Sequence, residues 1–241
     1  NRWFDDFQEI PFGIYKKLKI KRSDPEIVKK FIYNSRIQLD KSVYGHNRAK
    51  EEIIELISQW ITNPNTMGKV IALQGPMGNG KTTLVKNGIA KVLNRPFHLI
   101  GMGGAKDANL FEGHEYTYEG ARPGILVNIL KKSRCMNPVI FLDELDKISE
   151  TSEGDEISGI LCHLTDPVQN SGFKDRYIGP INIDLSKCIF VVSFNDESKI
   201  NPILKDRMTI INLKGFNIND KIKIGKEYLL PNIYKNIGFN S

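Results

Sequence analysis

The chain has 241 residues, enough for one α/β domain with flanking segments. Hydrophobic residues make up 40% of it, so it can bury a sizeable core, yet no run of about 18 apolar residues predicts a membrane span. Its three cysteines are far apart and lack CxxC spacing, which argues against a disulfide framework or a metal cluster. We therefore expect a non-membrane protein of a reducing compartment, the cytoplasm or, in a eukaryote, the mitochondrial matrix.

The net charge of +6 is concentrated in one segment. Between residues 14 and 41, nine lysines and arginines stand against three acids, which accounts for the whole excess. The basic run at residues 16–22 is compatible with a nucleic-acid patch. It contains no aromatic residue for base stacking, so a solvated connector is the preferred interpretation and nucleic acid stays an alternative partner.

The first part of the chain predicts three helices. A short one over residues 4–10 ends at a proline, and a second begins at the capping sequence Ser-Asp-Pro-Glu, residues 23–26. We expect this second helix to end near Ile37 and to be followed by a loop over 39–45. An apolar stripe from residue 53 to 61 then predicts a long amphipathic helix that begins near Asn47.

From residue 70 onward, apolar strand patterns alternate with helical ones. Strands are predicted at 70–73, 97–100, 139–142, 188–194 and 209–213, and helices at 81–93, 125–135, 155–164 and 219–229, before Pro231. A long glycine-rich connection occupies 101–124, where function often resides. The alternation predicts an α/β fold with a five-stranded parallel sheet flanked by helices.

The sequence GPMGNGKT follows the first strand and leads into a helix. This strand–loop–helix context is typical of a Walker A phosphate-binding loop, whose glycines let backbone N–H groups surround an anion. Lys81 is expected to reach the outer phosphates, and the Thr82 hydroxyl to bind Mg²⁺. The residues that we expect to bind the nucleotide are Gly75, Pro76, Met77, Gly78, Asn79, Gly80, Lys81, Thr82 and Thr83.

A second motif, VIFLDE at residues 139–144, ends a predicted strand with two adjacent carboxylates. Since the carboxyl ends of parallel strands face the ligand crevice, Asp143 is expected beside the Mg²⁺ held by Thr82. Glu144 is expected to act as general base for the water that attacks the terminal phosphate. A polar turn is the alternative for such a pair, but the spacing from the Walker A loop favours a Walker B motif.

Two later residues have open alternatives. Asn195 ends the fourth strand, where its amide is placed either to orient the attacking water or to form an Asx turn. Arg207 follows a short helix before the fifth strand. It is placed either to pair with Asp206 or to reach the nucleotide of a neighbouring subunit as an arginine finger.

The segments between these motifs carry a further pattern. They read FDDFQEIPFG (4–13), LDKSVYGHNRAKEEI (39–53), GMGGAKDANLFEGHEYTYEGARPGIL (101–126), TDPVQNSGFKDRYI (165–178), DLSKCIFVVSFN (184–195), NPILKDRM (201–208) and GFNINDKIKIGKEYLLP (215–231). With the two nucleotide motifs, they resemble the AAA+ ATPase module of Lon proteases over about residues 4–231. The departures include Phe12 in place of a tryptophan, Val43 in place of a usual histidine, and an apparent one-residue insertion at Thr165.

The resemblance implies roles for individual residues. Val43 and Tyr44 would lie near adenine, Asn195 would be the sensor 1 residue, and Arg207 would be the arginine finger. Tyr118 and Glu119 would occupy the pore loop that grips a substrate polypeptide. An aromatic ring suits that role, whereas the acid departs from the family pattern.

The resemblance also implies the organisation and activity. Residues 1–38 would be a helical, basic connector, 39–214 the large nucleotide-binding subdomain, and 215–241 the start of the small helical subdomain. We expect an ATP- and Mg²⁺-dependent ATPase that unfolds and translocates polypeptides in a homo-oligomeric, hexameric ring. Its parent would be an ATP-dependent serine protease, and this chain, which starts with Asn1 and is expected to be a fragment, would lack the peptidase part.

Two other functions stay open: a nucleic-acid motor or loader of the same superfamily, favoured only by the basic run at residues 16–22, and a nucleotide-dependent assembly scaffold with negligible turnover. The carboxylate of Glu144 argues against the scaffold, because a protein that only binds ATP has no need of a general base.

Overall fold

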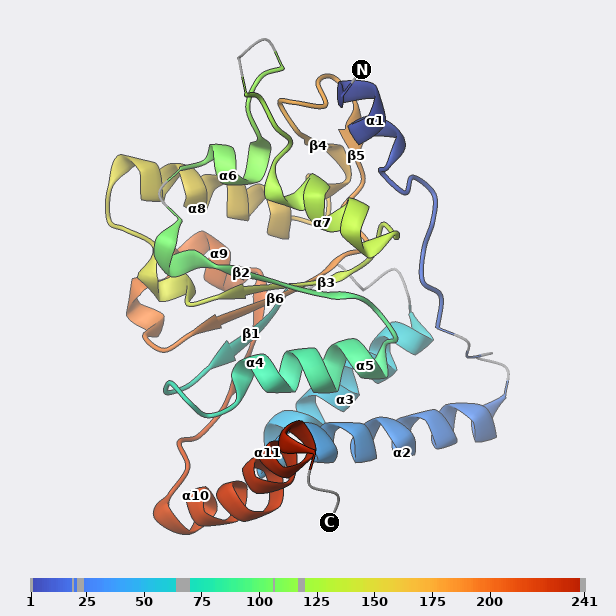
Figure 1. The fold of residues 1–241 in the computed structure, drawn as a ribbon, viewed down its shortest axis with the longest axis vertical. Helices are drawn as coiled ribbons and strands as arrows, with labels where there is room; N and C mark the ends of the chain where they lie inside the picture. The colour runs from blue at the N-terminus through green and yellow to red at the C-terminus, as the bar shows by residue number, and fades with distance from the viewer. Residues whose placement is uncertain are drawn as a thin grey trace.

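The structure, a computed structural model, describes residues 2–18, 20, 24–63, 70–105, 107–116 and 120–238. At its centre lies a sheet of five parallel strands in the order β2–β3–β6–β1–β7 (Figure 1). The strands are β1 (Val70–Gln74), β2 (Phe97–Gly101), β3 (Val139–Asp143), β6 (Ile189–Phe194) and β7 (Met208–Asn212). The predicted α/β fold with a five-stranded parallel sheet is confirmed.

Helices cover both faces of this sheet (Figure 1). One face carries α2 (Pro25–Ser42), α3 (Asn47–Thr62) and a continuous helix made of α4 (Lys81–Thr83), the π-helical η2 (Leu84–Ile89) and α5 (Ala90–Val92). The other carries α6 (Asn109–Glu112), α7 (Ile125–Ser133), α8 (Ser152–Thr165) and α9 (Pro202–Asp206). The three inner strands β1, β3 and β6 are therefore buried on both sides, which explains their continuous apolar sequences.

Alternate strand residues belong to two separate hydrophobic cores. In β3, Ile140 and Leu142 pack in the core beneath α7 and α8, whereas Val139 and Phe141 pack in the core beneath α2, α3 and η2. All four side chains are fully or almost fully buried. This two-sided packing fixes the carboxyl ends of the strands relative to one another. It therefore also fixes the positions of the polar residues that follow the strands.

The predicted amino-terminal helix is α1 (Arg2–Gln8), which lies near α7 and a small antiparallel pair, β4 (Phe173–Lys174) and β5 (Asn182–Ile183), that was not predicted (Figure 1). The Trp3 indole N–H donates to the Tyr177 carbonyl at 2.9 Å, and the Tyr177 hydroxyl donates to Asp6 at 2.9 Å. Burial and the Asp6 carboxylate raise the pKa of Tyr177 to about 12, so its hydroxyl stays a donor.

The prediction for the end of the second helix is wrong. The capping prediction holds, because the Asp24 side chain accepts from two backbone N–H groups of the first turn. However, α2 continues past Ile37 to Ser42, through most of the predicted loop. Leu39 is fully buried against η2, where a side chain at Gly88 would collide with it. Packing therefore extends the helix, and α2 crosses the predicted boundary at residue 38.

The chain also stays helical beyond Pro231, where an end was predicted. Helix α10 (Ile218–Ile224) continues through the π-helical η7 (Gly225–Leu229) into α11 (Leu230–Ile237). Proline lacks the N–H that a regular α-helical turn uses, and here a widened π turn directly precedes it. The Tyr228 hydroxyl donates to the Asp40 carbonyl at 3.1 Å and so ties this helix to α2.

Candidate active site

A cavity of about 360 Å³ opens at the carboxyl ends of β1, β3 and β6. It is lined by residues 77–83, which form most of the P-loop (residues 75–82) and the start of α4, together with Asp143, Glu144 and residues 193–195. Parallel strands bring these sequence-distant groups to one edge of the sheet. The structure thus gathers most of the predicted site residues around one space, and Val43, Tyr44 and Arg207 lie outside its lining.

Two glycines of the P-loop lie too close to neighbouring segments to carry a side chain. A Cβ atom at Gly75 would lie 2.2 Å from the Leu213 carbonyl oxygen, and one at Gly80, where φ is 88°, would lie 2.7 Å from the Val43 side chain. The Asn79 side-chain amide also donates to the Leu213 carbonyl at 3.2 Å. The loop is therefore clamped between the segment after β7 and the segment after α2, which fixes its backbone N–H groups for anion binding.

Lys81 lies at the centre of the site. Its ammonium group donates to the Gly75 carbonyl at 2.6 Å, to the Pro76 carbonyl at 3.0 Å and to Asn195 Oδ1 at 3.0 Å. Burial lowers the pKa of Lys81, and nearby carboxylates, chiefly that of Asp143, oppose this shift. The ammonium is thus held over the loop by weak carbonyl and amide acceptors, which an anionic phosphate would replace.

Thr82 and Asp143 are in contact across the cavity, with Oγ1 of Thr82 donating to Oδ2 of Asp143 at 3.3 Å. A hydroxyl and a carboxylate are hard oxygen donors, the ligands that Mg²⁺ prefers, and Mg²⁺ typically uses one or two such groups beside phosphate and water. Among the described residues no group of three or more His, Cys, Asp or Glu side chains forms a metal cluster. The donor set fits a cation that a phosphate ligand helps to hold.

Ser193 links the Asp143 carboxylate to the Glu144 backbone, and the sequence analysis gave it no role. Its buried hydroxyl donates to Asp143 and accepts the Glu144 backbone N–H at 3.1 Å. Glu144 adopts a left-handed conformation with φ of 61°, which costs on the order of 1–3 kcal/mol for a non-glycine residue. The hydrogen bond from its N–H therefore helps to hold a strained turn. A lone serine in the apolar sequence VVSF was the available signal.

Asp146 is a second residue that was missed. It is buried at 6% exposure, and its Oδ2 accepts the Asp196 backbone N–H at 3.2 Å. Its other oxygen, Oδ1, has no hydrogen-bond partner among the described residues. By binding the residue next to Asn195, Asp146 fixes the turn that presents the Asn195 amide to Lys81. Of the two roles considered for Asn195, orienting the attacking water or forming an Asx turn, this contact with Lys81 in the cavity favours the first.

The predicted adenine contacts lie beside the P-loop. Val43 touches Gly80, whereas the Tyr44 ring packs with the rings of Phe216 and Tyr228, each at a centroid distance of 6.3 Å. These two partners belong to the segment that contains α10 and η7. Tyr44 therefore joins the P-loop side of the molecule to its carboxyl-terminal helix.

His46 makes a further contact with the P-loop. Its Nε2–H donates to the Asn79 carbonyl at 2.9 Å, and its ring lies 4.8 Å from that of Phe216. Burial lowers the pKa of His46, an effect that Lys50 reinforces and that the Asn79 hydrogen bond and Asp220 oppose. The neutral imidazole is therefore favoured at this contact.

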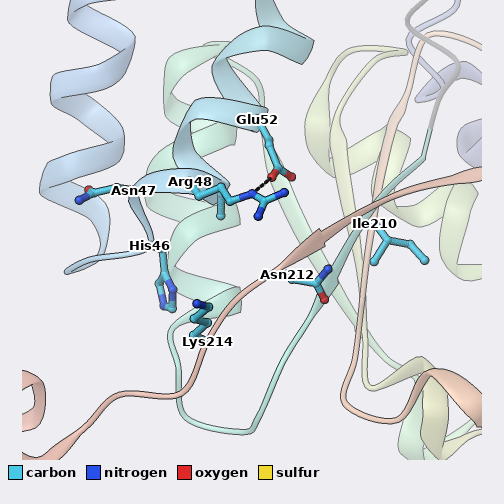
Figure 2. A pocket seen from close by; sticks show the side chains of 8 residues that line it. His46, Asn47, Arg48, Glu52, Ile210, Asn212 and Lys214 are labelled. Atoms are coloured by element: carbon cyan, nitrogen blue, oxygen red, sulfur yellow. Dashed lines mark hydrogen bonds and ion pairs between the residues drawn. The ribbon is translucent and has the colours of Figure 1, made fainter.

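A larger cavity, of about 430 Å³, lies between the start of α3 and the edge strand β7 (Figure 2). Figure 2 shows His46 and Lys214 pointing toward one another at its rim, with Arg48 paired to Glu52 at 3.0 Å. None of the predicted catalytic residues lines it. We choose the candidate active site by the chemistry of its lining residues rather than by its volume. The smaller cavity, with Lys81, Asp143 and Glu144, is therefore the candidate.

Arg207 forms its side-chain contacts with residues at the end of α8. Its Nη2 lies 3.1 Å from Oδ2 of Asp166, and its Nη1 donates to the Cys162 carbonyl. The predicted local alternative, a salt bridge to Asp206, is therefore replaced by an ion pair with the residue after α8. Arg207 also precedes β7, so it lies at the amino end of that strand, opposite the edge that holds the cavity.

The length of β7 separates Arg207 from the cavity. Its five residues run parallel to β1, with Met208 beside Val70 and Asn212 beside Gln74. At ~3.3 Å per residue this strand spans about 17 Å, more than twice the reach of an arginine side chain. Arg207 therefore cannot act on a ligand in the cavity of its own chain.

The predicted pore-loop residues Tyr118 and Glu119 lie outside the described residues. The base of their loop is described: the His114 N–H donates to the Arg122 carbonyl at 3.2 Å, and the Gly124 N–H donates to buried Asp175 at 2.8 Å. Within the described part of the chain, no helix is both long enough and apolar enough to cross a membrane.

Comparisons with known proteins agree with this geometry. The model of the ATPase family associated with various cellular activities (AAA) matches residues 71–216. A Lon protease from Chlamydia pneumoniae is 40% identical over 232 residues, which are 96% of this chain and 27% of that protein. A mitochondrial Lon protease homolog from Scheffersomyces stipitis is 38% identical over 237 residues, which are 98% of this chain and 21% of the relative.

A Lon protease homolog from Acanthamoeba polyphaga mimivirus is 39% identical over 211 residues, or 87% of this chain and 20% of the relative. The chain thus spans between a fifth and about a quarter of the length of these curated relatives. The family match covers the P-loop, both carboxylates, Asn195 and Arg207. The chain belongs to the AAA family of ATPases and is an AAA+ module of the Lon type.

Proposed function

We propose that this chain binds and hydrolyses ATP as the motor module of a Lon-like ATP-dependent serine protease. The observation that carries the proposal is the convergence of Lys81, Thr82, Asp143 and Glu144 on one cavity beside a clamped P-loop. Because the chain belongs to the AAA family of ATPases, we assign this cavity to a nucleotide rather than to an unspecified polar ligand.

In this proposal, residues 75–83 bind the triphosphate through backbone N–H groups, and the ammonium of Lys81 leaves its carbonyl acceptors for the outer phosphates. Thr82 and Asp143 hold Mg²⁺, which when bound neutralises charge that develops on the phosphates. Ser193 keeps the Asp143 carboxylate in a fixed orientation. Val43 and Tyr44 contact the adenine.

Glu144 then accepts a proton from the attacking water, and Asn195 helps to orient that water. A general base must be held in place to be effective, and two contacts do this here. The Glu144 N–H is bound by Ser193, and Gly103 leaves room for its carboxylate, because a Cβ there would lie 3.1 Å from Oε2. Lys81 and Asn195 are already in contact, which couples phosphate binding to the position of the amide.

Arg207 acts in trans as an arginine finger on the nucleotide of a neighbouring copy in a ring, which the family resemblance suggests is a hexamer. The distance along β7 supports this assignment, because it excludes action on the same chain's cavity. Tyr118 and Glu119 contact the polypeptide that the ring unfolds and translocates. The chain divides into a connector (1–38), a large subdomain (39–214) and the start of a small subdomain (215–241).

The test is ATP turnover by the full-length protein with and without an unfolded polypeptide. We expect stimulation by the polypeptide. Glu144→Gln should lower kcat by about 10³-fold while ATP binding survives, because it removes the base and leaves the P-loop intact. Lys147→Gln, a change at a neighbouring exposed residue outside the cavity lining, serves as control.

Stimulation by nucleic acid alone would support a nucleic-acid motor instead of the proposed protease motor. Wild-type turnover no faster than that of Glu144→Gln would support a nucleotide-dependent scaffold.

A further inference from the structure

We propose that Asp166 is a positioning residue that orients the Arg207 guanidinium for the nucleotide of a neighbouring copy. This inference rests on the proposed trans role of Arg207 and adds the residue through which this chain controls it. Asp166 directly follows α8 and belongs to the segment 165–178 that carries the family resemblance, but the sequence analysis gave it no role.

Two contacts fix the orientation of the guanidinium group. Nη2 of Arg207 lies 3.1 Å from Oδ2 of Asp166, and Nη1 donates to the Cys162 carbonyl, one turn earlier in α8. Anchoring both terminal nitrogens determines the plane of the group. A guanidinium carries five N–H groups, so these contacts leave others for a phosphate, and 30% of the Arg207 side chain is exposed.

The two oxygens of Asp166 have separate roles. Oδ1 accepts the backbone N–H groups of Val168 at 2.8 Å and Gln169 at 3.4 Å, which closes a turn after α8. Oδ2 faces Arg207. The Val168 hydrogen bond is the main cause that lowers the pKa of Asp166, with Arg207 contributing as well, so the carboxylate stays ionised at neutral pH. The turn after α8 thus fixes the position of the Asp166 carboxylate, and the carboxylate in turn fixes the position of the Arg207 guanidinium.

The supporting backbone is rigid on both sides of the contact. Leu161 and Leu164 on α8 and Leu204 on α9 are buried in the same hydrophobic core. The Arg207 N–H donates to the Leu204 carbonyl at 3.1 Å, which ends α9. Because a partly exposed ion pair contributes little to folding stability, the value of this contact lies in the orientation that it imposes on Arg207.

An isosteric substitution separates the two roles of Asp166. Asp166→Asn keeps an Oδ1 that can accept the Val168 and Gln169 N–H groups, but it removes the charge that faces Arg207. In the full-length protein we expect kcat for ATP to fall by about 10- to 100-fold, with KM and Tm little changed, because a misoriented group acts only in the transition state. Glu156→Gln, at an exposed position on α8, the helix that precedes Asp166, is the matched control and should behave as wild type.

A double-mutant cycle tests whether Asp166 acts through Arg207. If it does, Asp166→Asn should have no further effect in an Arg207→Ala background. Equal fold-losses in the wild-type and Arg207→Ala backgrounds would overturn the proposal, because they would indicate a general structural defect.

Mixed assemblies give a readout that a merely structural role would not change. Subunits that carry Glu144→Gln are expected to turn over ATP about 10³-fold more slowly, so nearly all turnover in a mixture with wild type should come from the wild-type subunits. Adding Asp166→Asn to the inactive subunits should lower this turnover further, since their Arg207 then serves the neighbours poorly. Equal turnover in the two mixtures would overturn the proposal.

Higher turnover with Asp166→Asn would also overturn it, because the ion pair would then restrain Arg207 rather than orient it. If the wild-type protein has no ATPase activity, the proposed function fails and this inference fails with it. Normal wild-type turnover with no loss in Asp166→Asn contradicts this inference alone.

Discussion

The two ends of the parallel sheet serve different purposes in this chain. At the carboxyl ends of β1, β3 and β6, several partly buried hydrogen bonds converge on the P-loop, Asp143 and Glu144. At the amino end of β7, Arg207 is held near the surface by Asp166 and one carbonyl. In the function that we propose, one end forms a cavity for a ligand of its own chain, whereas the other presents a cation to a neighbouring copy.

The difference illustrates how a parallel sheet could divide the proposed site between copies. Polar groups that follow neighbouring strands meet at one edge because all the strands point there. A residue that precedes a strand lies at the opposite edge, about 17 Å away along β7, and can contribute only to another molecule. The supporting contacts also differ: several partly buried hydrogen bonds surround the cavity, whereas an ion pair and a turn hold Arg207.

The largest effects are expected when one cation is removed from each end of the sheet, which tests whether the two ends act separately. Arg207→Ala should lower kcat by about 10³-fold and leave ATP affinity of the isolated chain unchanged, because the arginine serves another copy. Lys81→Ala should weaken ATP binding by about 100-fold in the same chain, since it removes a charge inside the cavity. Calorimetric titration with ATP and steady-state turnover measure the two effects.

Lys86→Ala is the control for both, because it removes an exposed lysine from the helix that Lys81 begins. Loss of ATP affinity in the isolated Arg207→Ala chain would show that the two ends of the sheet do not act separately.

A smaller effect is expected from the support of the cavity. Ser193→Ala removes a buried hydroxyl and leaves one Asp143 oxygen and the Glu144 N–H without this partner in a partly buried setting. Such losses cost about 1–3 kcal/mol in unfolding free energy, and we expect kcat to fall by about tenfold as the carboxylates lose their orientation. Urea denaturation and turnover are the measurements. Ser171→Ala, an exposed serine, should change neither, and a Ser193→Ala chain of wild-type stability and rate would contradict this assignment.

The smallest effect concerns pH. Burial lowers the pKa of His46 below its ordinary value of 6.5, so between these two values the unfolded chain binds more protons than the folded one. The free energy of unfolding should therefore fall as pH is lowered from 6.5 toward the folded pKa of His46. Urea midpoints at about pH 7.5 and about pH 5.5 measure this loss.

His46→Gln should reduce the loss on acidification. It should not abolish it, because burial also lowers the pKa of His98, which hydrogen-bonds to Ser133 far from the P-loop. An unchanged pH dependence in His46→Gln would show that His46 is not tuned by its contact. The Arg207 end should not respond in this range, because the lowered pKa of Asp166 moves its titration to more acidic pH.

The sequence by itself determined the parts that depend on local order. A glycine-rich loop between a strand and a helix, and two carboxylates after an apolar strand, predicted the P-loop and the positions of Asp143 and Glu144. These predictions hold because strand, turn and helix follow one another within a few residues, and because parallel strands bring their carboxyl ends together.

Only the tertiary structure revealed which distant groups support these motifs. Ser193 and Asp146 look like ordinary polar residues until β3 and β6 are paired, and Asp166 meets Arg207 only because α8 and α9 share one core. The end of α2 was missed for the same reason, since burial of Leu39 against η2 extends it to Ser42. The reactive residues of a motif can be identified from a short stretch of sequence. The groups that hold them in position come from segments that are far apart along the chain and meet only through packing.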